Sequence, residues 1–247
     1  LTMGNFLDKQ LLYPDSDYYL YDIPLSNLIY VSSLSTSSRF LKSIKCDSDG
    51  HIVVRVYFRR GESDQALLAH EQQLKEIFQK LSPHSCCLPF CHFYKSEKAA
   101  YLLRQHLHTT LGERLRSRPY LTMIERKWIA YQILEAVRTC HEASVYHGDI
   151  KTDNFVLTTW NWVCLTDFAS YKPVFLPDTD PSVFSYFFDS TGRRTCYLAP
   201  ERLQQRTFSA IQSTSVDSQL NAGMDVFSVG CVFVELFLDS HEPLFDL

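Results

Sequence analysis

The chain of 247 residues lacks several features that would place it in other classes of protein. None of its eight cysteines forms a Cys-x-x-Cys pair and no secretory signal is visible at the start, so a reducing, cytosolic compartment is expected. A net charge of −4 and the absence of a Lys/Arg run give no electrostatic field for nucleic acid. The longest apolar run, 226–238, contains Ser228 and Glu235 and is too short to span a bilayer.

Three motifs are present in one order and at one spacing. Residues 146–154 read Tyr-His-Gly-Asp-Ile-Lys-Thr-Asp-Asn, Asp-Phe-Ala follows at 167–169, and Ala-Pro-Glu stands at 199–201. Protein kinases carry a His-x-Asp loop followed by an Asn, a metal-binding Asp on a later turn, and an activation segment that ends at Ala-Pro-Glu. Asp225 opens a stretch that resembles the central helix of a kinase C-lobe. Each motif alone is common, but the ordered set predicts a protein-kinase-like fold.

The apolar pattern predicts an α+β fold with two lobes. The expected elements, in chain order, are strands at 28–31, 40–44 and 51–57, a helix at 65–81, a strand at 99–104, helices at 111–115 and 122–143, and strands at 155–157 and 163–165. The expected organisation is an N-terminal segment at 1–27, a small β-rich N-lobe at 28–104, a hinge at 105–110 and a mainly helical C-lobe at 111–247. Because the chain starts Leu-Thr-Met and stops soon after the Asp225 helix, we expect a fragment with a truncated C-lobe.

Four side chains of the expected C-lobe suit phosphoryl transfer, which needs positioned phosphates, metal ions and an oriented hydroxyl. Asp149 is the candidate to accept the proton of a substrate hydroxyl, and Lys151 would offer its ammonium to the transferred phosphate. Asn154 and Asp167 carry oxygen ligands of the kind that Mg²⁺ accepts. The Asp-x-Lys-x-x-Asn pattern resembles serine/threonine kinases. The alternative for all four is ordinary capping of loop backbone.

The expected phosphate-binding loop departs from the kinase pattern. No glycine lies at 34–40, where a glycine-rich loop normally lets backbone amides approach the phosphates. Ser35, Ser37 and Ser38 can still offer hydroxyl and amide donors there, although each carries a Cβ.

The third strand also departs from the pattern. Arg55 stands where kinases place a lysine. Arginine keeps the charge and can fork onto phosphate, but it is longer and planar. Its expected partner on the next helix is Glu71, with Glu76 as the second candidate; the alternative for either glutamate is a solvated helix face.

Two positions of the expected C-lobe are unusual. Gly148 replaces the arginine that normally precedes the catalytic Asp and grips a phosphate on the activation loop, which predicts weak or absent control by phosphorylation of that loop. Ala169 replaces the glycine of Asp-Phe-Gly, and its Cβ is expected to disfavour flipping of that turn.

Several longer stretches narrow the assignment. They are residues 147–151, 159–162, 165–170 and 193–202, with support from 38–42 and 186–189. Together they resemble the protein-kinase-like regulatory subunit of class III phosphatidylinositol 3-kinase, the large subunit of vacuolar sorting and autophagy. The resemblance covers essentially the whole chain, and its Trp-Asn-Trp and Asp-Phe-Ala-Ser pieces are far more specific than general kinase motifs.

This resemblance implies a serine/threonine protein kinase of weak activity that binds Mg²⁺ and ATP, with GTP as the alternative nucleotide. It implies assembly with the lipid kinase subunit and a Beclin-like scaffold, at the cytoplasmic face of endosomal, vacuolar or autophagic membranes. Family members are N-myristoylated, and Met3-Gly4-Asn5 resembles such a start with Gly4 as acceptor, although Asp8 stands where Ser or Thr is preferred. The alternative is a weak or inactive pseudokinase scaffold that restrains the lipid kinase subunit.

Overall fold

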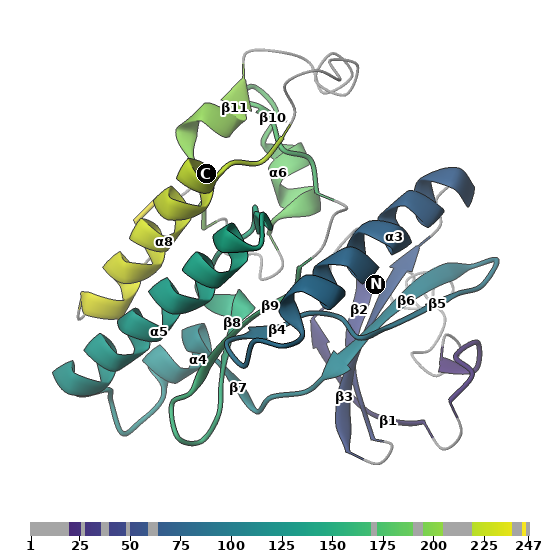
Figure 1. The fold of residues 1–247 in the computed structure, drawn as a ribbon, viewed down its shortest axis with the longest axis horizontal. Coiled ribbons are helices and arrows are strands. Elements are labelled where there is room, and N and C mark those ends of the chain that lie inside the picture. The colour runs from purple at the N-terminus through teal and green to yellow at the C-terminus, as the bar shows by residue number, and fades with distance from the viewer. Residues whose placement is uncertain are drawn as a thin grey trace, which may run out of the picture. The chain divides into compact units, whose positions relative to one another are not determined.

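The computed structural model describes residues 20–25, 28–35, 40–47, 50–58, 64–168, 172–189, 195–204, 219–238 and 244–245 (Figure 1). These residues form two compact units: residues 20–58 with 92–106, and residues 64–91 with those after 106. Each unit is described by itself. The predicted α+β protein kinase fold, with a β-rich first part followed mainly by helices, is confirmed. Gly4, Ser37, Ser38 and Ala169 lie outside the described residues.

The first unit is an antiparallel sheet of five strands. They are β1 (Ile29–Ser35), β2 (Phe40–Asp47), β3 (His51–Phe58), β5 (His92–Lys95) and β6 (Ala99–Gln105), in the order β1-β2-β3-β6-β5. Alternate residues Val54 and Val56 of β3 are buried against Tyr101 and Leu103 of β6, as expected for strands with one face on a core. Gly50, with a φ of +146° that side chains rarely adopt, directly precedes β3.

The second unit is mainly helical. Its helices are α3 (Asp64–Leu81), α4 (Leu111–Arg116), α5 (Met123–Glu142), α6 (Pro181–Phe187) and α8 (Ala222–Phe237), with 3₁₀ turns η1 (Thr152–Asn154) and η2 (Pro200–Arg202). One sheet has the strand order β4 (Cys87–Leu88), β9 (Val163–Thr166), β8 (Phe155–Leu157), β7 (Thr109–Thr110), and β10 (Leu176–Pro177) pairs with β11 (Leu203–Gln204). In Figure 1, α5 and α8 run side by side.

The core of the second unit lies between α5, α8 and the β8–β9 hairpin. Ile129 and Ile133 of α5, Val232 of α8 and Phe155 and Leu165 of the hairpin are fully buried there. The start of α5 is set by a capping box, in which the Thr122 side chain accepts from the Glu125 amide and Glu125 accepts from Thr122. No helix in the described part of the chain is long and apolar enough to cross a membrane. The apolar helix α8 contributes to this core instead.

A buried glutamine of α5 fixes the β8–β9 hairpin. Gln132 Nε2 donates to the Asn161 carbonyl at 2.9 Å, and Gln132 Oε1 accepts from the Val163 amide at 3.0 Å. The hairpin leads into Asp167, so this side chain connects a core helix to the strand before the predicted metal ligand.

We predict that Gln132→Met lowers the unfolding free energy by about 2 kcal/mol, because two buried backbone groups lose their partners. The matched control is Gln72→Met on the exposed face of α3, where a change within about 0.5 kcal/mol is expected. Chemical denaturation of the purified proteins measures both. Equal stability of the two variants would contradict this role of Gln132.

Candidate active site

The loop 146–151 is held by a carboxylate of α8. Asp225 Oδ1 accepts from the Gly148 amide at 2.8 Å, and Oδ2 accepts from the His147 amide at 2.9 Å and lies 3.0 Å from His141 Nε2. Burial by itself would raise the pKa of Asp225, but the hydrogen bond from His141, the nearby His147 ring and the two amides outweigh it and lower that pKa. Asp225 is therefore a buried anion that fixes two consecutive peptides of the loop.

The backbone at Gly148 explains why the usual arginine is absent. Gly148 has a φ of +70°, in the left-handed region that side chains disfavour. A Cβ built there would lie 2.6 Å from Leu220 Cδ1. Both the torsion and the neighbouring leucine therefore favour glycine in this loop.

The Asp149 carboxylate is buried among positive donors. Its Oδ2 accepts from Asn154 Nδ2 at 2.9 Å, forms an ion pair with Lys172 Nζ, and lies 3.7 Å from Lys151 Nζ. Burial opposes ionisation, but the charges of Lys151 and Lys172 outweigh it and lower the pKa of Asp149 to about 2. Among the described residues, every one of these contacts falls on Oδ2. Oδ1 is thus the oxygen left to accept a hydrogen bond from a substrate hydroxyl.

Lys151 lies beside Asp149, as the sequence predicts, and points to a neighbouring segment. Its Nζ donates to the Phe188 carbonyl at 2.9 Å, just after α6. The ammonium is buried, so a phosphate that enters the site would exchange for this carbonyl. The structure therefore brings together the predicted proton acceptor and the predicted phosphate-binding lysine.

Of the two predicted metal ligands, Asn154 contacts Asp149 directly and Asp167 follows β9. Asn154 Nδ2 donates to both the Asp149 carbonyl (2.7 Å) and its carboxylate (2.9 Å), which assigns Asn154 Oδ1 as the remaining acceptor. Asp167 is buried directly after β9, with a φ of +67°. An amide oxygen and a carboxylate fit Mg²⁺, which prefers oxygen ligands. Bound there, the ion would neutralise phosphate charge.

A buried histidine connects the two turns. His147 Nε2 lies 2.9 Å from the Thr166 carbonyl, and its ring packs edge-on against Phe168 at 4.8 Å between centroids. Burial lowers the pKa of His147, an effect that the charges of Asp225 and Asp149 oppose. Its position couples the loop of Asp149 to the turn of Asp167 through packing and one hydrogen bond.

Comparison with known proteins confirms the kinase prediction. The family model of the protein kinase domain matches residues 36–246 of the chain. The chain belongs to the protein kinase domain family.

Curated relatives of this kinase domain match almost all of it. Serine/threonine-protein kinase VPS15 of Arabidopsis thaliana is 45% identical over 99% of the chain, and its Dictyostelium discoideum counterpart, a probable serine/threonine-protein kinase vps15, is 42% identical over 99%. VPS15 of Saccharomyces cerevisiae is 40% identical over 95% of the chain. These names confirm the resemblance to the vacuolar sorting kinases. The chain spans only 12–16% of the length of these relatives.

Two predicted nucleotide-binding residues, Arg55 and Ser35, lie on strands of the first unit. Arg55 is on β3, half-buried, and pairs in register with Leu102 of β6. Ser35 is the last residue of β1. The placement of Arg55 on the third strand is as predicted, while contact with a nucleotide stays a prediction for both residues.

The predicted glutamate partner of Arg55 lies on α3. Glu71 Oε1 accepts from Lys75 Nζ at 2.6 Å, one turn later in the same helix, and the second candidate, Glu76, lines a cavity of the second unit. Arg55 belongs to the first unit and both glutamates to the second, so an Arg55–Glu71 pair stays a prediction.

Sequence reasoning missed two cations of the site. Lys172 follows Asp167 by five positions, and Arg202 comes directly after Ala-Pro-Glu. The sequence offered one signal for both residues, because each is a cation at a fixed offset from a recognised motif. Nothing in the sequence, however, predicts that Lys172 pairs with Asp149.

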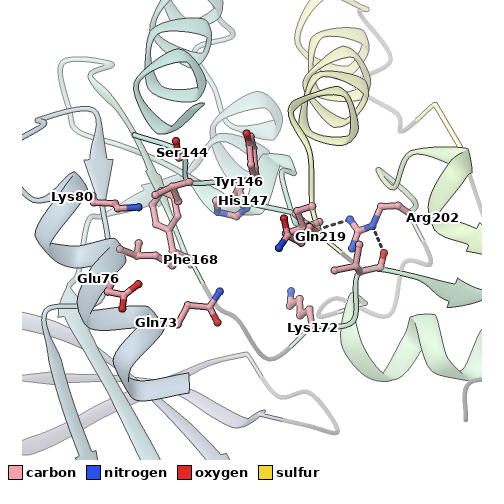
Figure 2. Close-up of a pocket in the computed structure, with 15 residues that line it drawn as sticks. Gln73, Glu76, Lys80, Ser144, Tyr146, His147, Phe168, Lys172, Arg202 and Gln219 are labelled. Atoms are coloured by element: carbon pink, nitrogen blue, oxygen red, sulfur yellow. Dashed lines mark hydrogen bonds between the residues drawn. The ribbon is translucent and has the colours of Figure 1, made fainter. Parts of the chain in front are cut away.

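Both cations line a cavity of about 400 Å³ in the second unit (Figure 2). Its walls come from α3, the loop before Asp149, the turn after β9 and the residues that precede α8. The lining residues are Gln73, Glu76, Ile77, Lys80, Ser144, Val145, Tyr146, His147, Gly148, Phe168, Lys172, Val174, Arg202, Gln219 and Leu220.

We predict that Gly148→Ala lowers the unfolding free energy by about 1–2 kcal/mol, because of the left-handed backbone and the contact with Leu220. The matched control is Gly230→Ala in α8, where a Cβ meets nothing within 4 Å. That variant is expected to gain about 0.5–1 kcal/mol from helix propensity. Thermal and denaturant unfolding compare the two, and a neutral Gly148→Ala would contradict the described backbone.

A second prediction concerns pH. An aspartate with a lowered pKa stabilises the folded state above its unfolded pKa near 3.8, and this stabilisation is lost as the pH falls through the folded value of about 2. Asp149→Asn is therefore expected to cost about 2 kcal/mol at neutral pH. The difference in unfolding free energy between Asp149→Asn and the wild type should shrink as the pH falls from about 4 to about 2. Denaturant unfolding as a function of pH measures it.

The control for this experiment is the exposed Asp178 after β10. Asp178→Asn removes one exposed carboxylate of the same unit, and the difference in unfolding free energy for Asp149→Asn is compared with the difference for this variant. A difference for Asp149→Asn that stays constant down to pH 2 would show that the carboxylate has the same pKa in both states.

Proposed function

We propose that this domain is a serine/threonine protein kinase that transfers phosphate slowly from Mg²⁺-bound ATP. The observation that carries the proposal is the arrangement around Asp149: Oδ2 is held by Asn154 and two lysines, and Oδ1 faces no described partner. Such a carboxylate is fixed and ionised, and it keeps one oxygen for a further hydrogen bond. Those are the properties that orienting a substrate hydroxyl requires.

The reaction follows from these side chains. Asp149 Oδ1 accepts the proton of a serine or threonine hydroxyl while that oxygen bonds to the terminal phosphorus and the bond to the leaving nucleoside diphosphate breaks. Lys151 carries the positive charge that stabilises the transferred group. Because a pKa of about 2 makes Asp149 a weak base, orientation of the hydroxyl contributes more than proton abstraction.

The slow rate is inferred from the predicted phosphate-binding residues of the first unit. The absence of glycine at 34–40 removes close backbone contacts to the phosphates. Arg55 replaces the strand lysine with a longer, planar cation. GTP is the alternative nucleotide of this proposal, because no contact among the described residues distinguishes the two bases.

The second candidate function is a pseudokinase scaffold that binds nucleotide and restrains a lipid kinase subunit. It is supported by the same departures at 34–40 and Arg55, together with Gly148. The two candidates differ in one observable, since the scaffold retains bound nucleotide without transferring phosphate.

For the whole protein we propose the regulatory role that the vacuolar sorting relatives suggest. It would assemble with the class III phosphatidylinositol 3-kinase catalytic subunit and a Beclin-like scaffold on endosomal, vacuolar or autophagic membranes. Myristoylation of Gly4 would contribute to membrane binding. One acyl chain binds membranes only marginally, so the partners would have to assist.

The test is a double variant of the full-length protein. Asp149→Ala with Asp167→Ala is expected to abolish transfer from Mg²⁺-bound ATP to a generic acceptor protein, because both the hydroxyl-orienting group and a metal ligand are lost. Radiolabel transfer measures the rate, and thermal unfolding verifies folding.

The control is Asp178→Ala, which removes an exposed carboxylate of the same unit and is expected to transfer like the wild type. Undiminished transfer by the double variant would reveal a contaminating kinase and overturn the proposal. Nucleotide retained without any transfer by the wild type would favour the scaffold.

A further inference from the structure

Arg202, the last residue of η2, is a buried arginine whose donors point at backbone. It is only 2% exposed. Its NH1 donates to the Gly148 carbonyl at 2.6 Å, its Nε to the Val174 carbonyl at 2.7 Å, and its NH2 to the Pro173 carbonyl at 3.1 Å. Figure 2 shows two of these bonds, to Gly148 and Val174. One side chain thus joins three segments of the chain.

The bond to Gly148 fixes the peptide that precedes Asp149. The amide of Gly148 already donates to Asp225, and its carbonyl accepts from Arg202. The residue is therefore held on its amide side by an anion and at its carbonyl by a cation. Because the carbonyl of Gly148 belongs to the peptide bond of Asp149, its orientation sets the direction in which the Asp149 side chain leaves the loop.

The bonds to Pro173 and Val174 fix the other side of the site. Lys172, the partner of Asp149 Oδ2, directly precedes Pro173. The Phe188 ring lies 5.2 Å from the Arg202 guanidinium and 5.1 Å from Lys172 Nζ, in the range of cation–π contacts.

The Arg202 guanidinium stays charged in this setting. Burial lowers its pKa to about 10, a change that the carboxylates of Asp149 and Asp225 oppose. A buried charge costs free energy unless it is paired and hydrogen-bonded. A neutral side chain with similar donors would fill the space of Arg202 without this cost. The presence of a charged side chain is therefore consistent with a role of Arg202 other than packing.

We propose that Arg202 positions Asp149: the Arg202 guanidinium holds the catalytic loop against residues 173–174 through hydrogen bonds to backbone carbonyls. The inference rests on the proposed function and adds how that site is assembled. Since the link uses carbonyl oxygens, it needs neither a side chain at position 148 nor an added phosphate.

The test uses Arg202→Gln in the full-length protein, with Arg202→Lys as the conservative variant. Transfer from Mg²⁺-bound ATP is expected to fall about tenfold to a hundredfold in kcat for Arg202→Gln, while KM for ATP changes by less than about threefold. Arg202→Lys keeps the charge and is expected to lie between Arg202→Gln and the wild type.

The matched control is Arg126→Gln. Arg126 is also buried and donates to a backbone carbonyl, that of Phe237, at 3.2 Å. It lies on α5 and makes no contact with Asp149 among those the structure gives. Its loss is expected to lower thermal stability but to leave kcat per folded molecule within about twofold of the wild type. Arg202→Gln behaving like Arg126→Gln would overturn the proposal.

A second readout does not depend on activity. Acetylation of lysines by a small amine-reactive reagent, read by mass spectrometry, is expected to speed up several-fold at Lys151 and Lys172 in Arg202→Gln. The exposed Lys127 serves as the reference. If the wild type transfers no phosphate, the proposed function fails, and labelling alone decides the role of Arg202. Equal labelling of Lys151 and Lys172 in Arg202→Gln and Arg126→Gln, each relative to Lys127, would overturn that role.

Discussion

The loop that carries the chemistry depends on the bond between the Asp225 carboxylate and two backbone amides. Asp225 lies in the first turn of α8, where the helix macrodipole favours a negative charge. Its two oxygens hold the amides of His147 and Gly148. Because α8 packs in the main core of the second unit, the loop inherits the rigidity of that core. The positions of Asp149 and the residues after it are a consequence of this attachment.

The second unit holds the predicted proton acceptor, whereas the predicted phosphate-binding residues of the first unit depart from the kinase pattern. Asp149, Lys151 and Asn154 are brought together as the chemistry requires, and their contacts keep Asp149 ionised. The stretch at 34–40 offers serines where backbone approach needs glycine, and Arg55 replaces lysine. A domain of this kind would keep the orientation of its substrate hydroxyl while binding the phosphates less closely, which is the physical basis for slow transfer or for a purely regulatory use of nucleotide.

The departures in the second unit form one connected arrangement. Gly148 adopts a left-handed backbone beside Leu220, which leaves no room for a long side chain. Besides Lys151, Lys172 places a positive charge next to the Asp149 carboxylate, and Arg202 places one at the Gly148 carbonyl. Both charges lie over the Phe188 ring. The cations thus reach the loop from segments that follow it in the sequence.

The order and spacing of the motifs determined the fold family, the placement of Arg55 on the third strand and the proximity of Asp149 and Asn154, because local spacing fixes which side chains share one loop. The long periodic helices α3, α5 and α8 were predictable for the same reason, whereas strands of two residues such as β4 and β10 carry no periodic signal. Only the tertiary structure decided that Lys172 contacts the Asp149 carboxylate and that Arg202 contacts the Gly148 carbonyl. Their contacts join residues 23 to 54 positions apart, and such pairs form through packing of the chain, which no local pattern encodes.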